Sequence, residues 1–324
     1  MTKKVLLTGC AGFVGSKVLE ILLKEDYHVV GLDNINDYYD ISLKHFRLNK
    51  FDSSKNFFFK KVDIENYDAL EEIFSSNEFD VIINLAARAG VRYSIENPFV
   101  YLSSNSLGSL NLLELAKKYN VPKYILASTS SLYAGQKMPY LEDLPVNEPI
   151  SPYAASKKSA EVMAYTYHKL FKLDVSVVRY FTVYGPGGRP DMSPFKFLNL
   201  IDRGEKVPVF GDGSQARDFT YIDDIAKGTI SAMKEVGFEI INLGGGKKPY
   251  TLNFMINKIE NLLEKKAKII YSEFNKADMM VTWADINKAS RLLNWQPETC
   301  FEDGLKKMAD DYFKNQDFYK TLKI

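Results

Sequence analysis

The stretch LLTGCAGFVGS, residues 6–16, places three glycines between a short apolar run and the start of a helical pattern. Gly9, Gly12 and Gly15 allow a tight turn, close packing of helix on strand, and close approach of the backbone to a pyrophosphate. The same spacing, G-x-x-G-x-x-G, also occurs in an ordinary glycine-rich turn between strand and helix. The surrounding sequence therefore has to separate a dinucleotide-binding turn from a structural one.

An acidic residue follows this turn where dinucleotide binding requires one. Asp33 comes 18 residues after Gly15, at the end of the second apolar run, HVVGLD. A carboxylate there accepts hydrogen bonds from an adenosine ribose and repels a 2′-phosphate, so NAD is favoured over NADP. Capping of a loop is the alternative role of Asp33. Asp63, after the third run, suits either an adenine amino group or a turn. We expect further dinucleotide contacts from Phe13, Val14, Ile64, Leu85, Ala86 and Ala87.

The first 180 residues alternate short apolar runs with longer helical patterns. Strands are predicted at 5–9, 28–33, 57–63, 81–87, 124–128 and 175–181, and helices at 13–24, 98–119 and 152–173. Strands that alternate with helices indicate βαβ units and a mostly parallel, doubly wound sheet, the α/β Rossmann arrangement. The apolar runs are continuous, as expected for strands covered on both faces.

The pattern changes after residue 180. A loop rich in Gly and Pro, YGPGGRPDMSP (184–194), is followed by shorter strand-like pieces, which predict a smaller mixed α/β substrate lobe. The segment from about 216 to 243 is expected to return to the first sheet. We therefore predict a dinucleotide-binding domain of residues 1–180 plus about 216–243. The second lobe takes 181–215 and 244–324.

Composition excludes several classes of function. The 324-residue chain has 42 Lys and Arg against 41 Asp and Glu, a net charge of +1, so we expect neither a nucleic-acid nor a membrane partner. It has two cysteines, no signal-peptide pattern and no apolar run long enough to span a membrane, which predicts a cytoplasmic protein. The three histidines do not cluster, and no metal site is predicted.

A tyrosine and a lysine share one face of the helix that Pro152 opens. Tyr153 and Lys157 are four residues apart, about one helical turn. A lysine ammonium near a phenol favours the phenolate, and so does an oxidised nicotinamide, so the two can bring a tyrosine pKa from its ordinary value of about 10 toward working pH. The alternative interpretation is a surface Tyr–Lys pair on an amphipathic helix. The preceding glycine turn and Asp33 favour the catalytic interpretation over it.

Four motifs together resemble the extended short-chain dehydrogenase/reductase superfamily, and within it the nucleotide-sugar epimerases and dehydratases. They are TGCAGFVG (8–15), NLAARAG (84–90), STSSLY (128–133) and SPYAASK (151–157). Longer stretches are most similar to UDP-glucuronate 4-epimerases. These are DNINDYYDISLK (33–44), AGVRYSIENP (89–98), FTVYGPGGRPDM (181–192), ARDFTYIDDI (216–225) and TWADINKA (282–289).

The resemblance implies a bound NAD, a UDP-sugar substrate and a catalytic set of Thr129, Tyr153 and Lys157. In such enzymes the tyrosine removes the proton of the sugar 4-hydroxyl while hydride leaves C4, and the lysine also binds the nicotinamide ribose. The resemblance further implies a homodimer built from the helices at 98–119 and 152–173. The residues expected to contact the substrate are Arg92, Thr129, Ser130, Ser131, Thr182, Arg189, Arg217 and Asp278, although each arginine also has a structural ion pair as its alternative role.

The two serines after Thr129 distinguish the possible reactions. Related decarboxylases carry Glu at the place of Ser131, and related dehydratases carry Asp-Glu at Ser130 and Ser131. A hydroxyl is no acid or base at neutral pH, so C4 epimerisation of UDP-glucuronate to UDP-galacturonate is the expected reaction. The alternatives are a neutral-sugar 4-epimerase, a decarboxylase, and a non-catalytic dinucleotide-binding protein. The sequence departs from the resemblance at Arg88, Ala134, Gly188 and Lys276, to which we assign no role.

Overall fold

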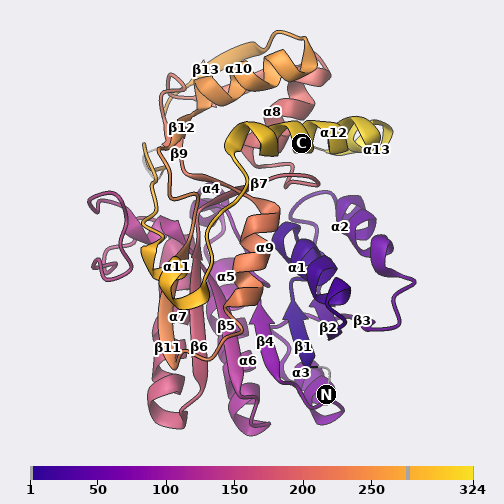
Figure 1. Ribbon diagram of the computed structural model, residues 1–324, viewed down its shortest axis with the longest axis vertical. Helices are drawn as coiled ribbons and strands as arrows, with labels where there is room; N and C mark the ends of the chain where they lie inside the picture. Colours follow the sequence, from indigo (N-terminus) through magenta and orange to yellow (C-terminus); the bar gives the residue numbers. More distant parts are fainter. Residues whose placement is uncertain (1–2, 275–277, 324) are drawn as a thin grey trace.

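The structure, a computed structural model, describes residues 3–274 and 278–323 (Figure 1). Its main sheet contains β1 (Lys4–Thr8), β2 (His28–Asp33), β3 (Phe57–Lys61), β4 (Val81–Asn84), β5 (Lys123–Thr129), β6 (Asp174–Tyr180) and β11 (Phe238–Leu243). Within the described residues this is a seven-stranded sheet in the order β11-β6-β5-β4-β1-β2-β3. Every pairing in it is parallel. The chain changes direction between β1 and β4, so the predicted doubly wound α/β fold is confirmed.

Helices cover both faces of this sheet, and every strand except the exposed edge strand β3 sends alternate side chains into two cores. One face carries α1 (Phe13–Lys24), α9 (Ile222–Ser231) and α11 (Asn287–Leu293). The other face carries α3 (Tyr67–Ser75), α6 (Gly108–Lys118) and α7 (Pro152–Phe171). Leu7 belongs to the first core and Leu6 to the second, as the two-residue period of a strand requires. Burial on both faces explains why the apolar runs are continuous.

The helix predicted over 98–119 contains a wider turn that the sequence pattern did not indicate. α5 (Phe99–Tyr101) leads into a π-helix, Leu102–Leu107, before α6 begins at Gly108. The π-helix carries Asn105, whose amide accepts a hydrogen bond from the Arg88 N–H (2.9 Å) and donates one to the Arg88 carbonyl (3.0 Å). The same amide donates to Ser156 Oγ of α7 at 2.9 Å. Such turns often occur at functional sites, and this one ties the segment after β4 to α7.

The remaining strands form short pairs beyond the carboxyl ends of the main sheet. They are β7 (Thr182–Tyr184) with β10 (Phe219–Tyr221), β8 (Lys206–Phe210) with β13 (Lys268–Ser272), and β9 (Ala216–Arg217) with β12 (Tyr250–Thr251). The helices beside them are α8 (Ser193–Asp202), α10 (Leu252–Leu263), α12 (Phe301–Lys314) and α13 (Gln316–Thr321).

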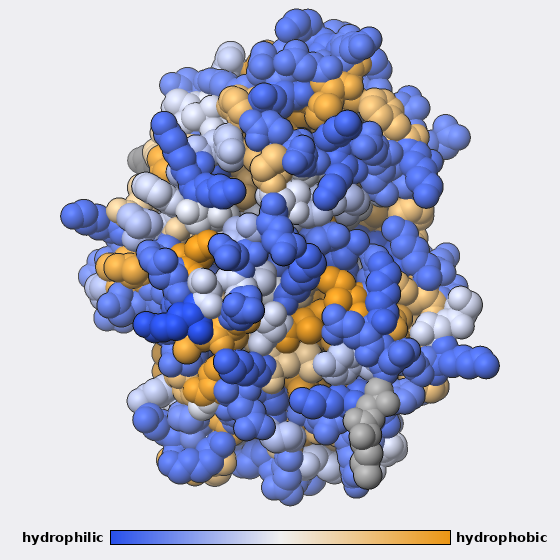
Figure 2. Space-filling view, viewed as in Figure 1, coloured by the Kyte–Doolittle hydropathy of each residue, from blue (hydrophilic) through white to orange (hydrophobic). Residues whose placement is uncertain are grey.

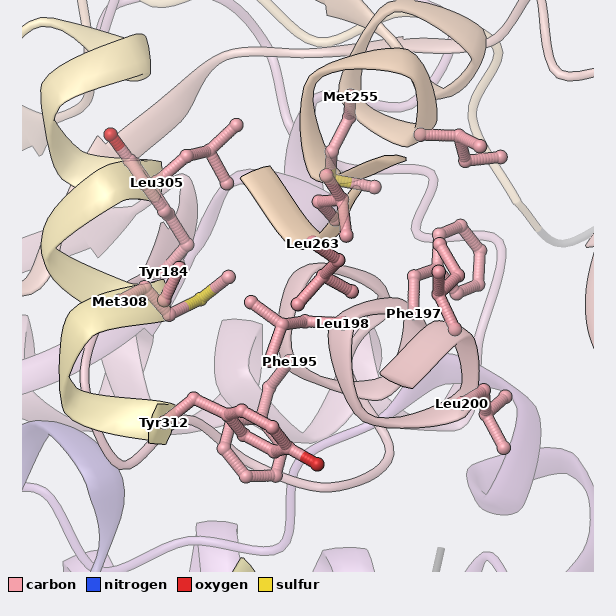
Figure 3. Packing of buried hydrophobic residues seen from close by; sticks show 14 of the residues in the cluster. Tyr184, Phe195, Phe197, Leu198, Leu200, Met255, Leu263, Leu305, Met308 and Tyr312 are labelled. Carbon is pink, nitrogen blue, oxygen red and sulfur yellow. The ribbon is translucent and has the colours of Figure 1, made fainter. Parts of the chain in front are cut away.

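A separate apolar core, the upper core, holds these strand pairs and helices together; it lies at the top of the view in Figure 1 and is shown in Figure 3. Phe195 and Leu198 of α8, Met255 of α10, and Leu305 and Met308 of α12 point into it and are buried. Because the core draws on helices from three distant stretches of the chain, the segments between them are held around a common centre. The cleft between this core and the main sheet therefore has a wall on each side.

Short helices complete the structure around the cleft. They are α2 (Ile41–Leu48), α4 (Val91–Glu96) and two 3-10 turns, Asn49–Phe51 and Ser130–Tyr133. The face seen in Figure 2, viewed as in Figure 1, is mainly hydrophilic, and its hydrophobic areas are small and separate. In the part of the chain that the structure describes, every helix is too short or too polar to cross a membrane.

Candidate active site

A cleft of about 760 Å³ lies at the carboxyl ends of the main-sheet strands, between them and the upper core. Ligands of doubly wound sheets bind at this edge, where the strand order reverses. All the residues predicted to bind cofactor or substrate, or to act in catalysis, line this one cleft. They are Gly9, Gly12, Phe13, Val14, Gly15, Asp33, Asp63, Ile64, Leu85, Ala86, Ala87, Arg92, Thr129, Ser130, Ser131, Tyr153, Lys157, Thr182, Arg189, Arg217 and Asp278. The structure brings them together, and their individual roles remain predictions.

The glycine turn leaves room for a phosphate group against the backbone. Gly9 has φ +69°, and a Cβ on it would lie 2.8 Å from the Ala86 nitrogen. A Cβ on Gly15 would lie 2.0 Å from the Gly9 carbonyl oxygen, so a side chain fits at neither position. Among the residues that the structure describes, no side chain caps α1 at Gly12. The N–H groups of the first helical turn and the bare backbone therefore suit a dinucleotide pyrophosphate.

Asp33 is buried and held in place by three donors. It accepts hydrogen bonds from the Ala11 N–H (3.3 Å), the Ile35 N–H (2.8 Å) and the Lys44 ammonium (3.3 Å). Lys44 also lines the cleft, and its side chain is 5% exposed against 7% for Asp33. The sequence analysis missed Lys44, although it lies in the quoted stretch DNINDYYDISLK. A ribose hydroxyl bound here meets a carboxylate and a cation together.

Asp63 both lines the cleft and takes part in a turn. Its carboxylate accepts the Glu65 N–H at 3.0 Å and the Asn34 side-chain amide at 2.6 Å. The two alternatives considered for Asp63 are therefore compatible, because a carboxylate can accept several hydrogen bonds at once.

The catalytic candidates come from β5 and the first turns of α7. Ser151 caps α7 by accepting the Ala154 N–H at 3.2 Å, and Pro152 follows it at a position that Pro favours. The helix then presents Tyr153 and Lys157 to the cleft. Lys157 Nζ donates to the Ala127 carbonyl of β5 at 2.8 Å, so the lysine anchors α7 to the strand that ends at Thr129.

Burial and neighbouring groups act on the pKa of Tyr153 in opposite directions. Burial raises the pKa of Tyr153, while a hydrogen bond with the Thr129 hydroxyl and the charge of Arg189 lower it. Burial also lowers the pKa of Lys157 to about 8, against a smaller opposing effect of the Glu161 carboxylate. The combined effect of Lys157 and an oxidised nicotinamide on Tyr153 stays a prediction. Desolvation outweighs the nearby charges in the protein by itself.

Hydroxyl groups surround the end of β5. Thr129 Oγ1 accepts the Ser131 N–H at 3.1 Å and so begins the 3-10 turn Ser130–Tyr133. Ser130 is 8% exposed and lines the cleft together with Ser131. Ser128, on the same strand, is also in the cleft, and its buried Oγ has no partner among residues 3–274 and 278–323. This wall of the cleft therefore offers hydroxyl groups, and positions 130 and 131 carry no carboxylate.

Two of the predicted arginines converge on Asp278. Arg92 of α4 forms an ion pair with Asp278, with Nε 3.2 Å from Oδ2, and its guanidinium stacks on Phe210 at 3.7 Å from the ring centre. Arg217 of β9 donates to the carbonyls of Ala216 (3.0 Å) and Met280 (3.2 Å). Burial lowers the pKa of Arg217, Asp278 raises it, and Arg92 lowers it further. The two cations and the acid therefore act on one another at one end of the cleft.

Arg189 occupies a different part of the cleft. Its Nε donates to Asp191 Oδ1 at 3.0 Å, and its guanidinium lies 5.7 Å from the centre of the Tyr38 ring. Burial lowers the pKa of Arg189, but the electrostatic effects of Asp191 and Tyr38 oppose it, and the net result is a raised pKa. Neither Tyr38 nor Asp191 was predicted, although both belong to quoted motifs. Arg189 is thus a permanent cation near Tyr153, whose pKa it lowers.

The departures from the family pattern have different surroundings. Arg88 lines the cleft, and its buried Nε has no hydrogen-bond partner within the described residues. Gly188 lies against Phe195, where a Cβ would approach that side chain to 3.0 Å. Ala134 ends the 3-10 turn after the serines. Lys276 lies outside the described residues.

Comparisons with known proteins agree with this geometry. The sequence pattern of the GDP-mannose 4,6 dehydratase family matches residues 6–308. A UDP-glucuronate 4-epimerase of Thermodesulfobacterium geofontis is 57% identical over 319 residues, 98% of this chain and 99% of the relative. UDP-glucuronic acid 4-epimerase of Bacillus cereus, solved in complex with UDP-glucuronic acid and NAD, is 37% identical with a TM-score of 0.90, over 96% of this chain and 99% of the other.

A neutral-sugar enzyme is also similar in structure. UDP-glucose 4-epimerase of Thermotoga maritima, solved with UDP-glucose, is 31% identical with a TM-score of 0.87, over 97% of this chain and 99% of the other. The sheet, the glycine turn and the Thr–Tyr–Lys set define the class as an extended short-chain dehydrogenase/reductase. Within that class, the chain belongs to the nucleotide-sugar epimerase and dehydratase family that carries the GDP-mannose 4,6 dehydratase pattern.

Proposed function

We propose that the protein is an NAD-dependent 4-epimerase that converts UDP-glucuronate to UDP-galacturonate. The observation that carries the proposal is the Thr129, Tyr153 and Lys157 set, followed by two serines, in a cleft that fits a dinucleotide. The 57% identity with a UDP-glucuronate 4-epimerase over 98% of the chain supports the same reaction and substrate.

Each residue of the set has a task that its position permits. Bound NAD supplies the hydride acceptor and donor that inversion at C4 needs. Tyr153 takes the proton of the sugar 4-hydroxyl on its phenolic oxygen and returns it later. Thr129, whose hydroxyl lowers the pKa of that phenol, orients the same sugar oxygen. Lys157, a turn along the helix, binds a ribose hydroxyl and stabilises the phenolate once it forms.

The absence of an acid at positions 130 and 131 limits the fate of the 4-keto sugar. Loss of water requires a base and an acid beside the ketone, and loss of carbon dioxide leaves an enolate that must take up a proton from such a group. Ser130 and Ser131 offer neutral hydroxyls, so reduction from the opposite face of the sugar is the remaining reaction. The same hydroxyls hydrogen-bond a carboxylate without repelling it, which suits a uronate.

The charged residues divide the substrate between two regions of the cleft. We assign the uronate carboxylate to Arg189 with Thr182 and the serines, because Arg189 is the cation that acts on Tyr153. We assign the diphosphate to Arg92 and Arg217, and the uridine ribose to Asp278. Guanidinium groups suit both anions because they offer paired donors.

A product analysis tests the proposal. Purified protein is incubated with UDP-glucuronate, and the nucleotide sugars are separated by anion-exchange chromatography. UDP-galacturonate is the expected product, whereas a UDP-pentose would indicate a decarboxylase. A parallel incubation with UDP-glucose tests the neutral-sugar alternative, and turnover of neither sugar would reject the proposed reaction.

We also propose the division into a dinucleotide-binding domain, 1–180 plus about 216–243, and a sugar-nucleotide lobe, 181–215 and 244–324. The pairing of β11 with β6 and the packing of α9 beside α1 support it. A cytoplasmic location is proposed on the two free cysteines, of which Cys10 is buried.

We propose a homodimer that uses α7 and the neighbouring 99–107 segment of each protomer. Side chains there are apolar and exposed: Phe99 79%, Leu102 51%, Leu107 47%, Val162 52% and Tyr165 45%. Apolar groups gathered on adjacent helices are expected at an interface. Sedimentation analysis should give a dimer, and Leu102→Glu with Val162→Glu should give a monomer. Sedimentation of the unmodified protein as a monomer at micromolar concentration would contradict the proposal.

A further inference from the structure

The buried face of α2 carries a cation that the proposed reaction does not use. Leu43, Lys44, Arg47 and Leu48 form that face, and Arg47 is 3% exposed. Arg47 forms no ion pair with any carboxylate of the described residues, and its Nε has no partner there. Burying a guanidinium without a counter-charge is unfavourable unless its donors are otherwise satisfied. Its remaining contacts therefore indicate why it is there.

The guanidinium joins two loops that are distant in sequence. Nη1 donates to the Ala11 carbonyl of the glycine turn at 3.1 Å and to the Tyr39 hydroxyl at 2.7 Å. Nη2 donates to the Gly187 carbonyl at 2.7 Å. Gly187 lies two residues before Arg189 in the same loop. One rigid, planar group thus spans the cofactor-binding turn and the loop that presents Arg189 to the cleft.

Gly187 also lies beside Tyr319. A Cβ on Gly187 would be 3.7 Å from the Tyr319 hydroxyl, which donates to Asp311 Oδ2 at 2.7 Å. Its φ of +64° is one that side chains rarely adopt. The Arg47 bond to its carbonyl therefore fixes the peptide plane from which the chain continues to Arg189.

The segment that ends at Arg47 makes further contacts with both the glycine turn and the Arg189 loop. Asp33, at its start, accepts from the Ala11 N–H, and Tyr38 places its ring beneath Arg189. The rings of Phe13 and Tyr39 also flank the Arg47 guanidinium, with centres 5.9 and 5.5 Å from its central carbon. Residues 33–47 therefore contact both the glycine turn and the Arg189 loop.

We propose that Arg47 is a positioning residue that sets the Arg189 loop against the glycine turn, so that Arg189 can receive the acidic end of the sugar. This inference rests on the proposed role of Arg189. Arg47 is not among the residues that line the cleft, so its loss should affect binding of the uronate more than the chemical step. The affinity for UDP, which lacks the sugar, should therefore not change when Arg47 is replaced.

The test compares Arg47→Met, Arg47→Lys and Tyr39→Phe with Arg203→Met, a control that removes an arginine from the exposed pair with Glu205. Titration calorimetry gives Kd for UDP-glucuronate, UDP-glucose and UDP, and steady-state assays give kcat and KM. Arg47→Met should raise Kd and KM for UDP-glucuronate about tenfold, or about 1.4 kcal/mol, with kcat within about threefold of the unmodified enzyme. Kd for UDP should change by less than about twofold.

The other variants keep the inference testable if Arg47→Met folds poorly. Arg47→Lys keeps the charge but cannot span both carbonyls, so it should restore binding only in part. Tyr39→Phe removes one acceptor of the guanidinium and should give a smaller change in the same direction. Equal weakening of UDP and UDP-glucuronate, or a lower Tm with unchanged Kd values, would overturn the proposal. Failure of the unmodified protein to convert UDP-glucuronate rejects the proposed reaction instead, and the calorimetric comparison still decides the role of Arg47.

Discussion

Lys157 of α7 donates a 2.8 Å hydrogen bond to the carbonyl of Ala127, two residues before Thr129 on β5. The bond places the ammonium inside the protein between the strand and the helix that supply the proposed catalytic set. Burial there lowers the pKa of Lys157 to about 8, and Glu161, one turn further along α7, partly opposes the change. The position that orients the lysine is therefore also the position that makes its charge costly.

A pH-dependent stability difference follows from this burial. The pKa of Lys157 is about 8 in the folded protein against an ordinary 10.5, so the unfolded chain binds more protons between these values. Lys157 therefore makes the free energy of unfolding rise as pH increases from about 8 toward 10.5. This gain is lost again as pH falls back through about 8. Urea denaturation at several pH values should show that rise in the unmodified protein relative to Lys157→Met. A difference that is constant from about pH 7 to about pH 10 would contradict it.

Replacing the proposed base tests the catalytic assignment. Tyr153→Phe removes the phenolic oxygen and should lower kcat by about 10²- to 10⁴-fold, the usual contribution of a positioned acid–base group. The fold and the NAD content should not change, because the ring remains. Tyr167→Phe, on the same helix with its hydroxyl bonded to Glu114, is the matched control. Comparable activity in both variants would remove Tyr153 from the mechanism.

Introducing an acid beside Thr129 tests why the ketone is reduced. Ser131→Glu places a carboxylate where the resemblance puts one in decarboxylases, and it repels the substrate carboxylate. We expect epimerisation to fall at least about tenfold and a UDP-pentose to become detectable by chromatography. Ser131→Ala, which adds no charge, should form no pentose. Full epimerase activity in Ser131→Glu would show that this position lies away from the sugar.

Exchange of the buried acid tests the cofactor preference. Asp33→Asn keeps a hydrogen-bond acceptor but removes the charge that repels a 2′-phosphate, and it leaves the Lys44 ammonium without its counter-charge. The ratio of NAD to NADP affinity should fall by about tenfold or more, measured by calorimetry on protein stripped of cofactor. Asp80→Asn, whose carboxylate accepts the Lys4 N–H at 2.7 Å outside the cleft, should leave the ratio unchanged.

Sequence patterns were most informative where one local rule governs the structure. α1 begins at Phe13 and ends at Lys24 as predicted, because a glycine turn precedes it and apolar residues recur at helical spacing along it. β2 occupies the predicted HVVGLD. The π-helix at Leu102–Leu107 was not predicted, because the wider turn is stabilised by the contacts of Asn105 with Arg88 and Ser156, which are distant in sequence.

The motifs also indicated charged residues of the cleft, but not the side chains with which these residues form ion pairs. The sequence indicated Arg189 and Asp33 as charged groups for the cleft, but not that Asp191 and Lys44 engage them. The burial that raises the pKa of Tyr153 could not be read from the sequence for a related reason. Spacing on a helix gives the distance between two side chains, whereas desolvation depends on everything packed around them.

By itself, the sequence determined the doubly wound fold, the family, and the absence of an acid after Thr129, because each depends on the identity and local order of residues. The tertiary structure decided which charges are neutralised, which are buried, and that Arg47 joins the Ala11 and Gly187 carbonyls. Electrostatic interactions and desolvation act through space, so residues far apart in the sequence set them only once the chain has folded.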